Sequence, residues 1–501
     1  MTTILDDPDR RVVPRWRPWR EAAGLGEISP AMPKRVPYKP NLEELGRTAF
    51  DWKKNRSLPF AADFLGAAFA LGQGSIAKDA AEFVLASKLQ TNRALRKLAN
   101  LVLSDQTAAN QVMMEPVLSS IDSSRRRIRA LRKSLHAFPR NPLDLMDLAR
   151  EYVALGQPWA ATKPVREALA LAPANRFVLR CAARFFLHNK DSEQAHDILR
   201  KATVTKKDPW LVAAEIAVAS AAGRNPSLVK TGRQFVESKN FHPAHISELA
   251  SALGTLELEA GKVRMMKQLF RKALENPTEN SVAQAAWISR RISSWVIEPN
   301  VLTTPRSYEA GAWTSIMHNN WEDSLAAAEL WLCDEPFSKR PTIFGSWVAL
   351  TVAPDFGKAE RIAQHGLERH KNDFLLQNNL AVALAYQGRY LEAMRSFERI
   401  PREESEGPYR ATYLATSGLL QFRLGAPDEG RKLYRMAVNE AKKKNEIRSV
   451  VWALLHLARE EYRLAPAKGD EIVKEAIAEF PKMLKVEQAM ASRLIKLIVP
   501  T

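Results

Sequence analysis

Apolar residues recur at helical spacing along most of this chain, in pairs of segments joined by short polar turns. Residues 377–400, QNNLAVALAYQGRYLEAMRSFERI, contain two such runs that meet at Gln387-Gly388-Arg389. Glycine adopts the left-handed conformation at little cost, so Gly388 is expected to end the first helix. The pattern predicts a helical hairpin whose turn lies at Gly388.

The hairpin pattern repeats with a period of 34 residues in both halves of the chain. The matching pairs are Tyr152 and Phe186, Ala161 and Ala195, Ala168 and Ala202, and Ala359 and Ala393. Alanines fit where two helices approach closely, and larger side chains fill the groove beside them. One hairpin cannot bury its apolar faces alone, so the repeat predicts a stack of hairpins.

The repeat resembles the tetratricopeptide (TPR) family, whose hairpins carry W-x2-L-G-x2-Y, then A-x3-F, then A and P. The matching positions in residues 142–173 are Leu145, Leu148, Ala149, Tyr152, Ala161, Val165, Ala168 and Pro173. In residues 374–407 they are Leu380, Ala381, Leu384, Ala393 and Phe397. The resemblance implies an all-α fold, an α-solenoid of stacked antiparallel helical hairpins that forms a right-handed superhelix with a concave groove.

In the TPR family this groove is lined mainly by first helices and commonly holds extended or helical peptides of partner proteins. Carried over unit by unit, the resemblance implies these groove-facing residues: Arg150, Arg180, Arg184, His188, Asn378, Asn379, Tyr386 and Arg423. The amide of Asn379 suits a peptide bond, but an exposed or intrahelical polar residue explains it equally well. Arg180 and Arg184 lie one turn apart and can meet one carboxylate or phosphate, although solvated surface arginines show the same spacing.

Changes in pattern along the chain predict four regions. Residues 1–56 form a basic arm rich in Pro, Arg and Trp, and residues 57–140 form a helical region that ends in a basic amphipathic helix. Residues 141–300 and 301–501 form two blocks of TPR-like repeats. The irregular stretch from Val296 to Pro305 is the expected break between the blocks.

Two basic segments precede the repeats. Residues 125–140 contain six Arg and one Lys with no acid, and their apolar residues recur at helical spacing. The residues expected to contact an anionic partner are Arg125, Arg126, Arg127, Arg129, Arg132 and Lys133. A solvated helix face explains this segment equally well. In the extended arm, Trp16 and Trp19 stand among arginines and prolines, where they can stack on bases or dock into an apolar pocket of this chain or of a partner.

The composition favours an acidic partner, because 74 Lys and Arg against 56 Asp and Glu leave a net charge of +18. The start, MTTILDDPDRR, lacks the basic and apolar regions of a secretory signal. Only two cysteines occur, so no disulfide framework is expected. The most apolar stretches fall short of a bilayer span. A cytoplasmic location is therefore expected.

Candidate motifs for catalysis and metal binding fail one by one. The stretch GTLELEAGKV lacks the spacing of a phosphate-binding loop. Pro243 separates His242 from His245, which bars an interior helical metal pair, and no third ligand is apparent. The sequence therefore predicts no catalytic residue, no metal site and no cofactor.

Two functions remain compatible with these patterns. The first is a non-catalytic scaffold or adaptor that binds proteins with acidic or extended segments through its groove, with the basic N-terminal region as a second contact. The alternative is an accessory subunit that docks an effector enzyme and contacts nucleic-acid phosphates through the basic segments. A salt-dependent mobility shift with arbitrary DNA or RNA would favour the alternative.

Overall fold

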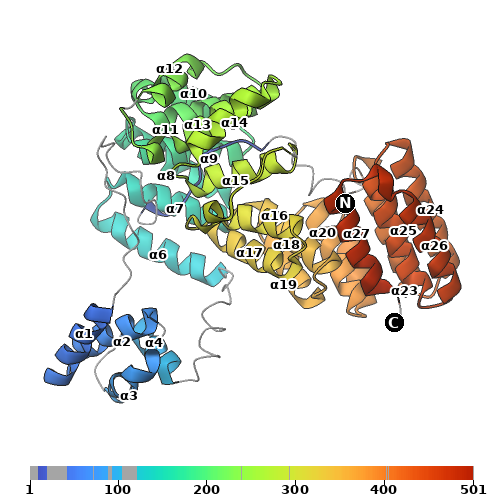
Figure 1. Cartoon of the computed structure of the whole chain (residues 1–501), viewed down its shortest axis with the longest axis horizontal. Coiled ribbons are helices and arrows are strands. Elements are labelled where there is room, and N and C mark those ends of the chain that lie inside the picture. The colour runs from blue at the N-terminus through green and yellow to red at the C-terminus, as the bar shows by residue number, and fades with distance from the viewer. Residues whose placement is uncertain are drawn as a thin grey trace. The chain divides into compact units, whose positions relative to one another are not determined.

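The computed structural model describes residues 10–19, 42–71, 73–87, 93–103, 121–238, 240–292, 294–401, 403 and 406–499. Residues 1–9 and 20–41 of the predicted arm lie outside this described part. The chain divides into two compact units, residues 32–117 and residues 1–31 with 118–501. The regular structure of the described residues consists of helices, without any strand (Figure 1).

The smaller unit is a helical bundle with its own core. Its helices are α1 (Leu42–Lys54), α2 (Leu58–Ala70), α3 (Lys78–Ala86) and α4 (Arg93–Leu103), with a 3-10 turn at Gly74–Ala77. Trp52 is 1% exposed and packs edge-on against Phe83, with ring centroids 5.1 Å apart. Helix α1 thus lies within the range predicted as the arm, residues 1–56.

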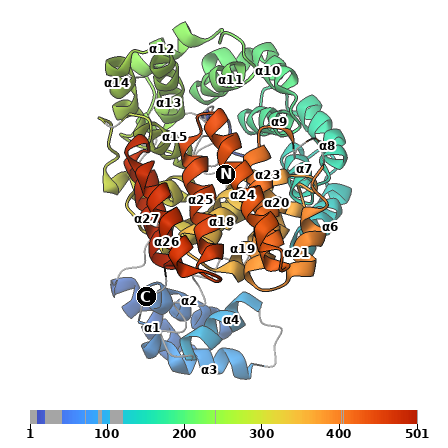
Figure 2. The ribbon, with the colours of Figure 1, turned by 90° about the vertical axis from the view of Figure 1, so that its right-hand side faces the viewer.

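The larger unit consists of consecutive helices whose chain order is visible in Figure 2. Those of its first part are α6 (Ile121–Ala137), α7 (Pro142–Ala154), α8 (Pro158–Leu171), α9 (Arg176–His188), α10 (Ser192–Lys201), α11 (Pro209–Ala221), α12 (Val229–Glu237), α13 (Pro243–Glu259), α14 (Val263–Ala273) and α15 (Glu279–Ser289). Those of its second part are α16 (Tyr308–Met317), α17 (Trp321–Asp334), α18 (Lys339–Thr351), α19 (Phe356–Leu367), α20 (Phe374–Tyr386), α21 (Tyr390–Phe397), α23 (Arg410–Arg423), α24 (Pro427–Lys443), α25 (Ile447–Glu461), α26 (Pro466–Ala478) and α27 (Lys485–Ile498).

Successive helices pack as hairpins, which confirms the predicted fold class. Helix α7 packs on α8, α13 on α14, α18 on α19 and α23 on α24. The turns at Gly156, Gly388 and Gly425 have φ of 71°, 82° and 89°, the left-handed conformation that ends a helix. At the hairpin seams, Ala161 and Ala393 are 0% exposed, so the small residues lie where the period predicts them.

The two helices of a hairpin differ in burial. In α20 nearly every residue is buried, whereas in α21 the buried residues are Ala393, Ser396 and Phe397. The same contrast holds between α9 and α10 and between α11 and α12. First helices therefore lie inside the stack, and second helices present one face to solvent.

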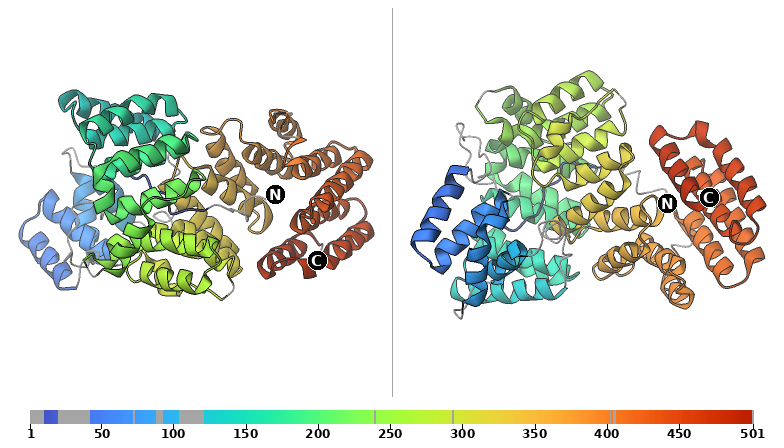
Figure 3. Two further views of the ribbon diagram at one scale, coloured as in Figure 1. Left: turned by 90° about the horizontal axis from the view of Figure 1, so that it is seen from above. Right: turned by 60° about the horizontal axis from the view of Figure 1, so that its bottom comes forward.

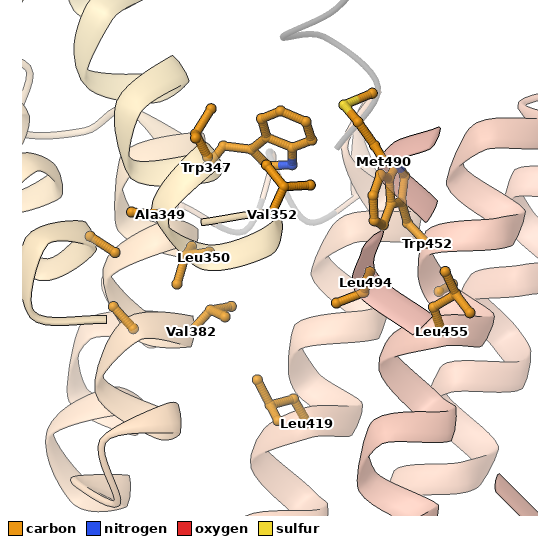
Figure 4. Packing of buried hydrophobic residues seen from close by; sticks show 14 of the residues in the cluster. Trp347, Ala349, Leu350, Val352, Val382, Leu419, Trp452, Leu455, Met490 and Leu494 are labelled. Atoms are coloured by element: carbon orange, nitrogen blue, oxygen red, sulfur yellow. The ribbon is translucent and has the colours of Figure 1, made fainter. Parts of the chain in front are cut away.

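An irregular stretch separates α15 from α16, where the break at Val296–Pro305 was expected. Its regular structure is a 3-10 turn at Pro299–Thr303. From α16 onward the helices share one continuous apolar core that reaches Ile498 in α27. Figure 4 shows part of this core, with Trp347 and Val382 on one side and Trp452 and Leu494 on the other.

The hairpin of α23 and α24 depends on the absence of a side chain at Gly418. A Cβ there would lie 2.7 Å from Cδ2 of Tyr434 and 2.9 Å from the carbonyl oxygen of Gly430. Because the second contact is with backbone, the helices must move apart in Gly418→Ala. We expect its free energy of unfolding, measured by urea titration with circular dichroism, to fall by roughly 1–3 kcal/mol.

Gly311→Ala provides the matched control within a helix. A Cβ at Gly311 meets its nearest atom, Cβ of Ala327, at 3.7 Å, an ordinary contact. This variant should keep the parent stability or gain up to about 1 kcal/mol from a less flexible unfolded chain. Equal stability of both variants would contradict the close approach of α23 and α24.

Candidate functional site

Residues 10–19, called here the arm segment, form an extended stretch of backbone that lies against α7, α15, α16 and α17. Pro14 and Pro18 exclude a helix from this segment. Along it, buried residues alternate with partly exposed ones from Arg10 to Trp16, as expected for extended backbone. Figure 3 shows the segment in blue among the green helices.

Trp16 anchors the arm segment in the apolar core of the first block. Its side chain is 0% exposed. The indole packs edge-on against Phe185 of α9, with centroids 6.1 Å apart, and against Phe337, with centroids 5.7 Å apart. Trp16 thus joins the first block to the residues that precede α18, and the predicted arm contact at this residue lies within the same chain.

Glu309 of α16 lies at the centre of the charged contacts. Arg10 donates from Nε to Oε1 at 2.9 Å and from Nη2 to Oε2 at 3.0 Å, and Arg15 and Arg340 pair with the same carboxylate. Burial alone would raise the pKa of Glu309, but the three guanidinium groups hold it well below its usual range. The carboxylate is therefore charged whenever the arm segment is in place.

Arg15 and Arg17 of the arm segment also reach carboxylates at the end of α17 and at the start of α15. Arg15 pairs with Glu335 at 2.5 Å, and Arg17 pairs with Asp334 at 2.7 Å and with Glu279 at 2.7 Å. Burial would raise the pKa of Glu335, but the guanidinium groups of Arg15 and Arg184 lower it to about 2. Each of these charges thus has a partner of opposite sign in the interior.

Polar side chains of the helices also hold the backbone of the arm segment. The donors and acceptors are Arg150 Nε to Trp16 O at 2.9 Å, Asn280 Nδ2 to Val13 O at 2.9 Å, and Gln284 Nε2 to Arg10 O at 3.0 Å. Contacts to backbone carbonyls are independent of the side chains that a bound segment carries. Arg150, a predicted groove residue, therefore holds an extended peptide, which here belongs to the same chain.

Trp19 ends the segment at two carboxylates of α7. Its backbone N–H donates to Asp147 Oδ1 at 3.0 Å, and its indole Nε1 donates to Asp144 Oδ1 at 3.2 Å. Burial raises the pKa of Asp147 to about 7, although the Trp19 N–H and Arg150 favour its charged form. This end of the arm segment is therefore sensitive to protonation near neutral pH.

The other predicted groove residues of the first block lie close to these contacts. The guanidinium of Arg184 lies 5.3 Å from the ring centroid of Phe337, and the His188 ring lies 5.9 Å from it. Arg180 is 2% exposed and donates to Glu248 at 2.9 Å. Contact of these side chains with a partner stays a prediction, because the structure shows them packed within the chain.

The predicted groove residues of the second block likewise bond within the chain. The pairs are Asn378 Oδ1 with Thr416 Oγ1 at 2.7 Å, Asn379 Nδ2 with Ser346 Oγ at 2.9 Å, Tyr386 OH with His456 Nδ1 at 3.0 Å, and Arg423 Nη2 with Glu460 Oε1 at 2.8 Å. Among the four, Tyr386 also lines an open cavity. Its neighbours there come from α20, α23, α24 and α25.

Helix α6 carries the predicted basic contact residues. Arg127 pairs with Glu151 of α7 at 2.9 Å, and Arg132 donates to the Tyr152 hydroxyl at 2.5 Å. The other predicted residues, all exposed on α6, are Arg125, Arg126, Arg129 and Lys133. Two of the six arginine and lysine side chains thus secure α6 against the first hairpin, and the rest face solvent.

The residues considered for metal binding and for thiolate chemistry have other roles in the described part of the chain. No group of three His, Cys, Asp or Glu side chains there has the arrangement of a metal site. His242 accepts the N–H of Ala244 at a helix start, and His245 accepts from Trp210 Nε1 at 3.1 Å. Burial raises the pKa of Cys333 to about 11, which opposes a thiolate. None of the described helices is long and apolar enough to cross a membrane.

Comparisons with known proteins find no matching family model and no matching curated protein. Solved structures do match. The crystal structure of the APC/C hetero-tetramer Cut9–Hcn1 is 13% identical, covers 91% of this chain and 92% of that chain, and has a TM-score of 0.34. The crystal structure of yeast Tom70 is 14% identical, with 89% and 97% coverage and a TM-score of 0.30. The hairpins of the chain itself define its fold.

The chain is an α-solenoid of stacked helical hairpins. Glycine turns, alanine seams and buried first helices occur where the repeat places them. The sequence patterns did not predict the acidic residues that hold the arm segment, chiefly Glu309 and Glu335. The only sequence signal for them was the four arginines in residues 10–17, which need carboxylate partners once they are buried.

The Trp16 anchor leads to a stability prediction. Trp16→Ala removes a fully buried indole and should lower the free energy of unfolding of the larger unit by roughly 3–5 kcal/mol. Trp159→Ala is the matched control, because Trp159 is 71% exposed and its loss should change stability by less than about 0.5 kcal/mol. Urea titration of both variants measures the difference, and equal values would mean that the arm segment is not anchored.

The pKa of Asp147 leads to a pH prediction. In the folded solenoid the Asp147 carboxyl has a pKa of about 7, whereas in the unfolded chain its pKa is near 3.8. The contribution of Asp147 to the free energy of unfolding is therefore complete below about pH 4. It is lost as the pH rises from about 4 to about 7. Asp147→Asn should remove this loss in thermal unfolding midpoints, while exposed Asp323→Asn should not. Parallel pH profiles of all three proteins would refute the assignment.

Proposed function

We propose that this solenoid is a non-catalytic scaffold or adaptor that binds an extended segment of a partner protein on its inner helices. One observation carries the proposal: the inner helices already hold an extended peptide, residues 10–19 of the chain itself. They do so with backbone contacts, an aromatic anchor and ion pairs, the means by which proteins bind extended segments. A cytoplasmic location is part of the proposal and suits two free thiols.

The arm segment also indicates where a partner would bind. In the first block the inner helices are covered by the arm segment, whose Trp16 is fully buried. In the second block a cavity beside Tyr386 is open, and no described segment lies in it. The cavity between α20, α23 and α25 is therefore the proposed partner surface. The basic helix α6 is the second contact, for partners with acidic segments.

A photocrosslinking experiment tests the scaffold function. The crosslinker p-benzoylphenylalanine is placed at Ala415, which lines the cavity, or at Ala467 on the exposed face of α26. We expect a partner protein of the native host to crosslink from position 415 and not from position 467. Equal crosslinking from both positions would contradict binding on the inner helices, and no crosslinked protein would contradict a scaffold.

The second candidate function is that of a nucleic-acid-associated subunit. It is favoured by Arg126, Arg129 and Lys133, which are exposed on α6 and form no ion pair or hydrogen bond with another described residue. Their spacing along one side of the helix suits a row of phosphates. The two functions differ in how binding depends on salt, which allows a direct test.

A triple substitution of Arg126, Arg129 and Lys133 to Gln removes three charges and retains helix propensity. If α6 binds phosphate, the affinity for duplex DNA should fall and the slope of log K against log salt should become shallower by up to about 3. Changing exposed Lys442, Lys443 and Lys468 to Gln is the charge-matched control. Unchanged affinity and slope in the α6 variant would exclude this candidate.

A further inference from the structure

The second block contains an aromatic-lined cavity between its inner helices. The cavity encloses about 480 Å³ of empty space, including its open mouth. Val382 and Tyr386 of α20, Leu419 of α23 and Trp452 of α25 form apolar walls, and Tyr434 of α24 lies behind them. In Figure 4, Val382 lies on one side and Leu419 and Trp452 lie on the other.

Two polar groups at this cavity lack partners among the described residues. Trp452 is 2% exposed and His456 is 7% exposed, yet the indole Nε1 and the imidazole Nε2 form no hydrogen bond. The other imidazole nitrogen, Nδ1, is engaged by the Tyr386 hydroxyl at 3.0 Å. Burial lowers the pKa of His456 to about 3, so its ring is neutral. Buried donors and acceptors that are unsatisfied in the free protein favour a ligand that satisfies them.

The first block shows what kind of ligand covers inner helices in this solenoid. There the arm segment inserts one large apolar side chain, Trp16, between aromatic rings, and donors from the helices hold its backbone. The cavity of the second block has the same components, aromatic walls and polar groups at Thr412 and Ser449. The cavity is open to solvent at its mouth, so a side chain of a bound segment can enter it from there.

We infer that this cavity is a binding site for one large apolar side chain, of leucine, methionine or phenylalanine, carried by an extended segment of a partner protein. The side chain enters between Tyr386 and Trp452. A backbone carbonyl next to it accepts from the Trp452 indole N–H after a small movement of the ring. The inference rests on the proposed scaffold function, for which it specifies the recognised feature of the partner.

A small probe tests the cavity apart from the scaffold function. N-acetyl-leucinamide at millimolar concentration should show saturation transfer from the full chain in NMR, and N-acetyl-glycinamide should not. Ala415→Leu, which places a side chain into the cavity, should abolish the transfer, whereas Ala467→Leu on α26 should leave it unchanged. Equal transfer to both probes, or equal transfer in both variants, would overturn the inference.

A displayed library of 12-residue peptides, selected on the full chain, then tests the partner's chemistry. Selected peptides should share one large apolar residue and should bind Ala415→Leu at least about tenfold more weakly than Ala467→Leu. Peptides that bind both variants equally would overturn the inference and leave the scaffold function standing. A probe that binds the cavity without any selected peptide would contradict the scaffold function instead.

A second copy of this chain is the other occupant to exclude. If the cavity served self-association, the parent protein would sediment as a dimer, and Ala415→Leu would convert it to a monomer. We expect the sedimentation coefficients of the parent, Ala415→Leu and Ala467→Leu to agree. A dimer that only Ala415→Leu dissociates would overturn the assignment to a partner protein.

Discussion

A buried carboxylate is stable only where cations neutralise it, and Glu309 is buried with 3% exposure. Three guanidinium groups surround it, and two of them, those of Arg10 and Arg15, come from the arm segment. The interior of the larger unit therefore depends on ten residues from the start of the chain for its charge balance. The arm segment is thereby a structural element of the solenoid, although it has no regular secondary structure.

The two blocks use their inner helices differently. In the first block and at its junction with the second, backbone contacts and ion pairs fix one extended peptide, so the recognition groups there are occupied in the isolated chain. In the second, the wall of the cavity is bonded to itself through pairs such as Tyr386 with His456, which rigidify the cavity without filling it. Ligand capacity thus remains around α20, α23 and α25, which the described contacts of the arm segment do not include.

The sequence predicted what depends on neighbours in the chain. Turns at Gly156 and Gly388 and the seam at Ala393 follow from spacing alone, because each hairpin packs on the next. The predicted groove residues were harder to interpret, because the repeat gives the helix on which Arg180 lies but not the residues that cover it. The partner of Arg15 could not be predicted, since no local pattern links it to Glu335, which lies 320 residues further along the chain.

The separation between the arm segment and its carboxylates has a consequence for how the protein is made. Hairpins of a solenoid can fold one after another as they leave the ribosome, because each needs only its neighbours. Arg10, however, lies 299 residues before Glu309, an interval that translation at roughly 5–20 residues per second covers in about 15–60 s. The arm segment thus cannot reach its place until Glu309 and Glu335 have been synthesised. Until then, a nascent chain exposes a basic, tryptophan-bearing segment that the folded molecule buries.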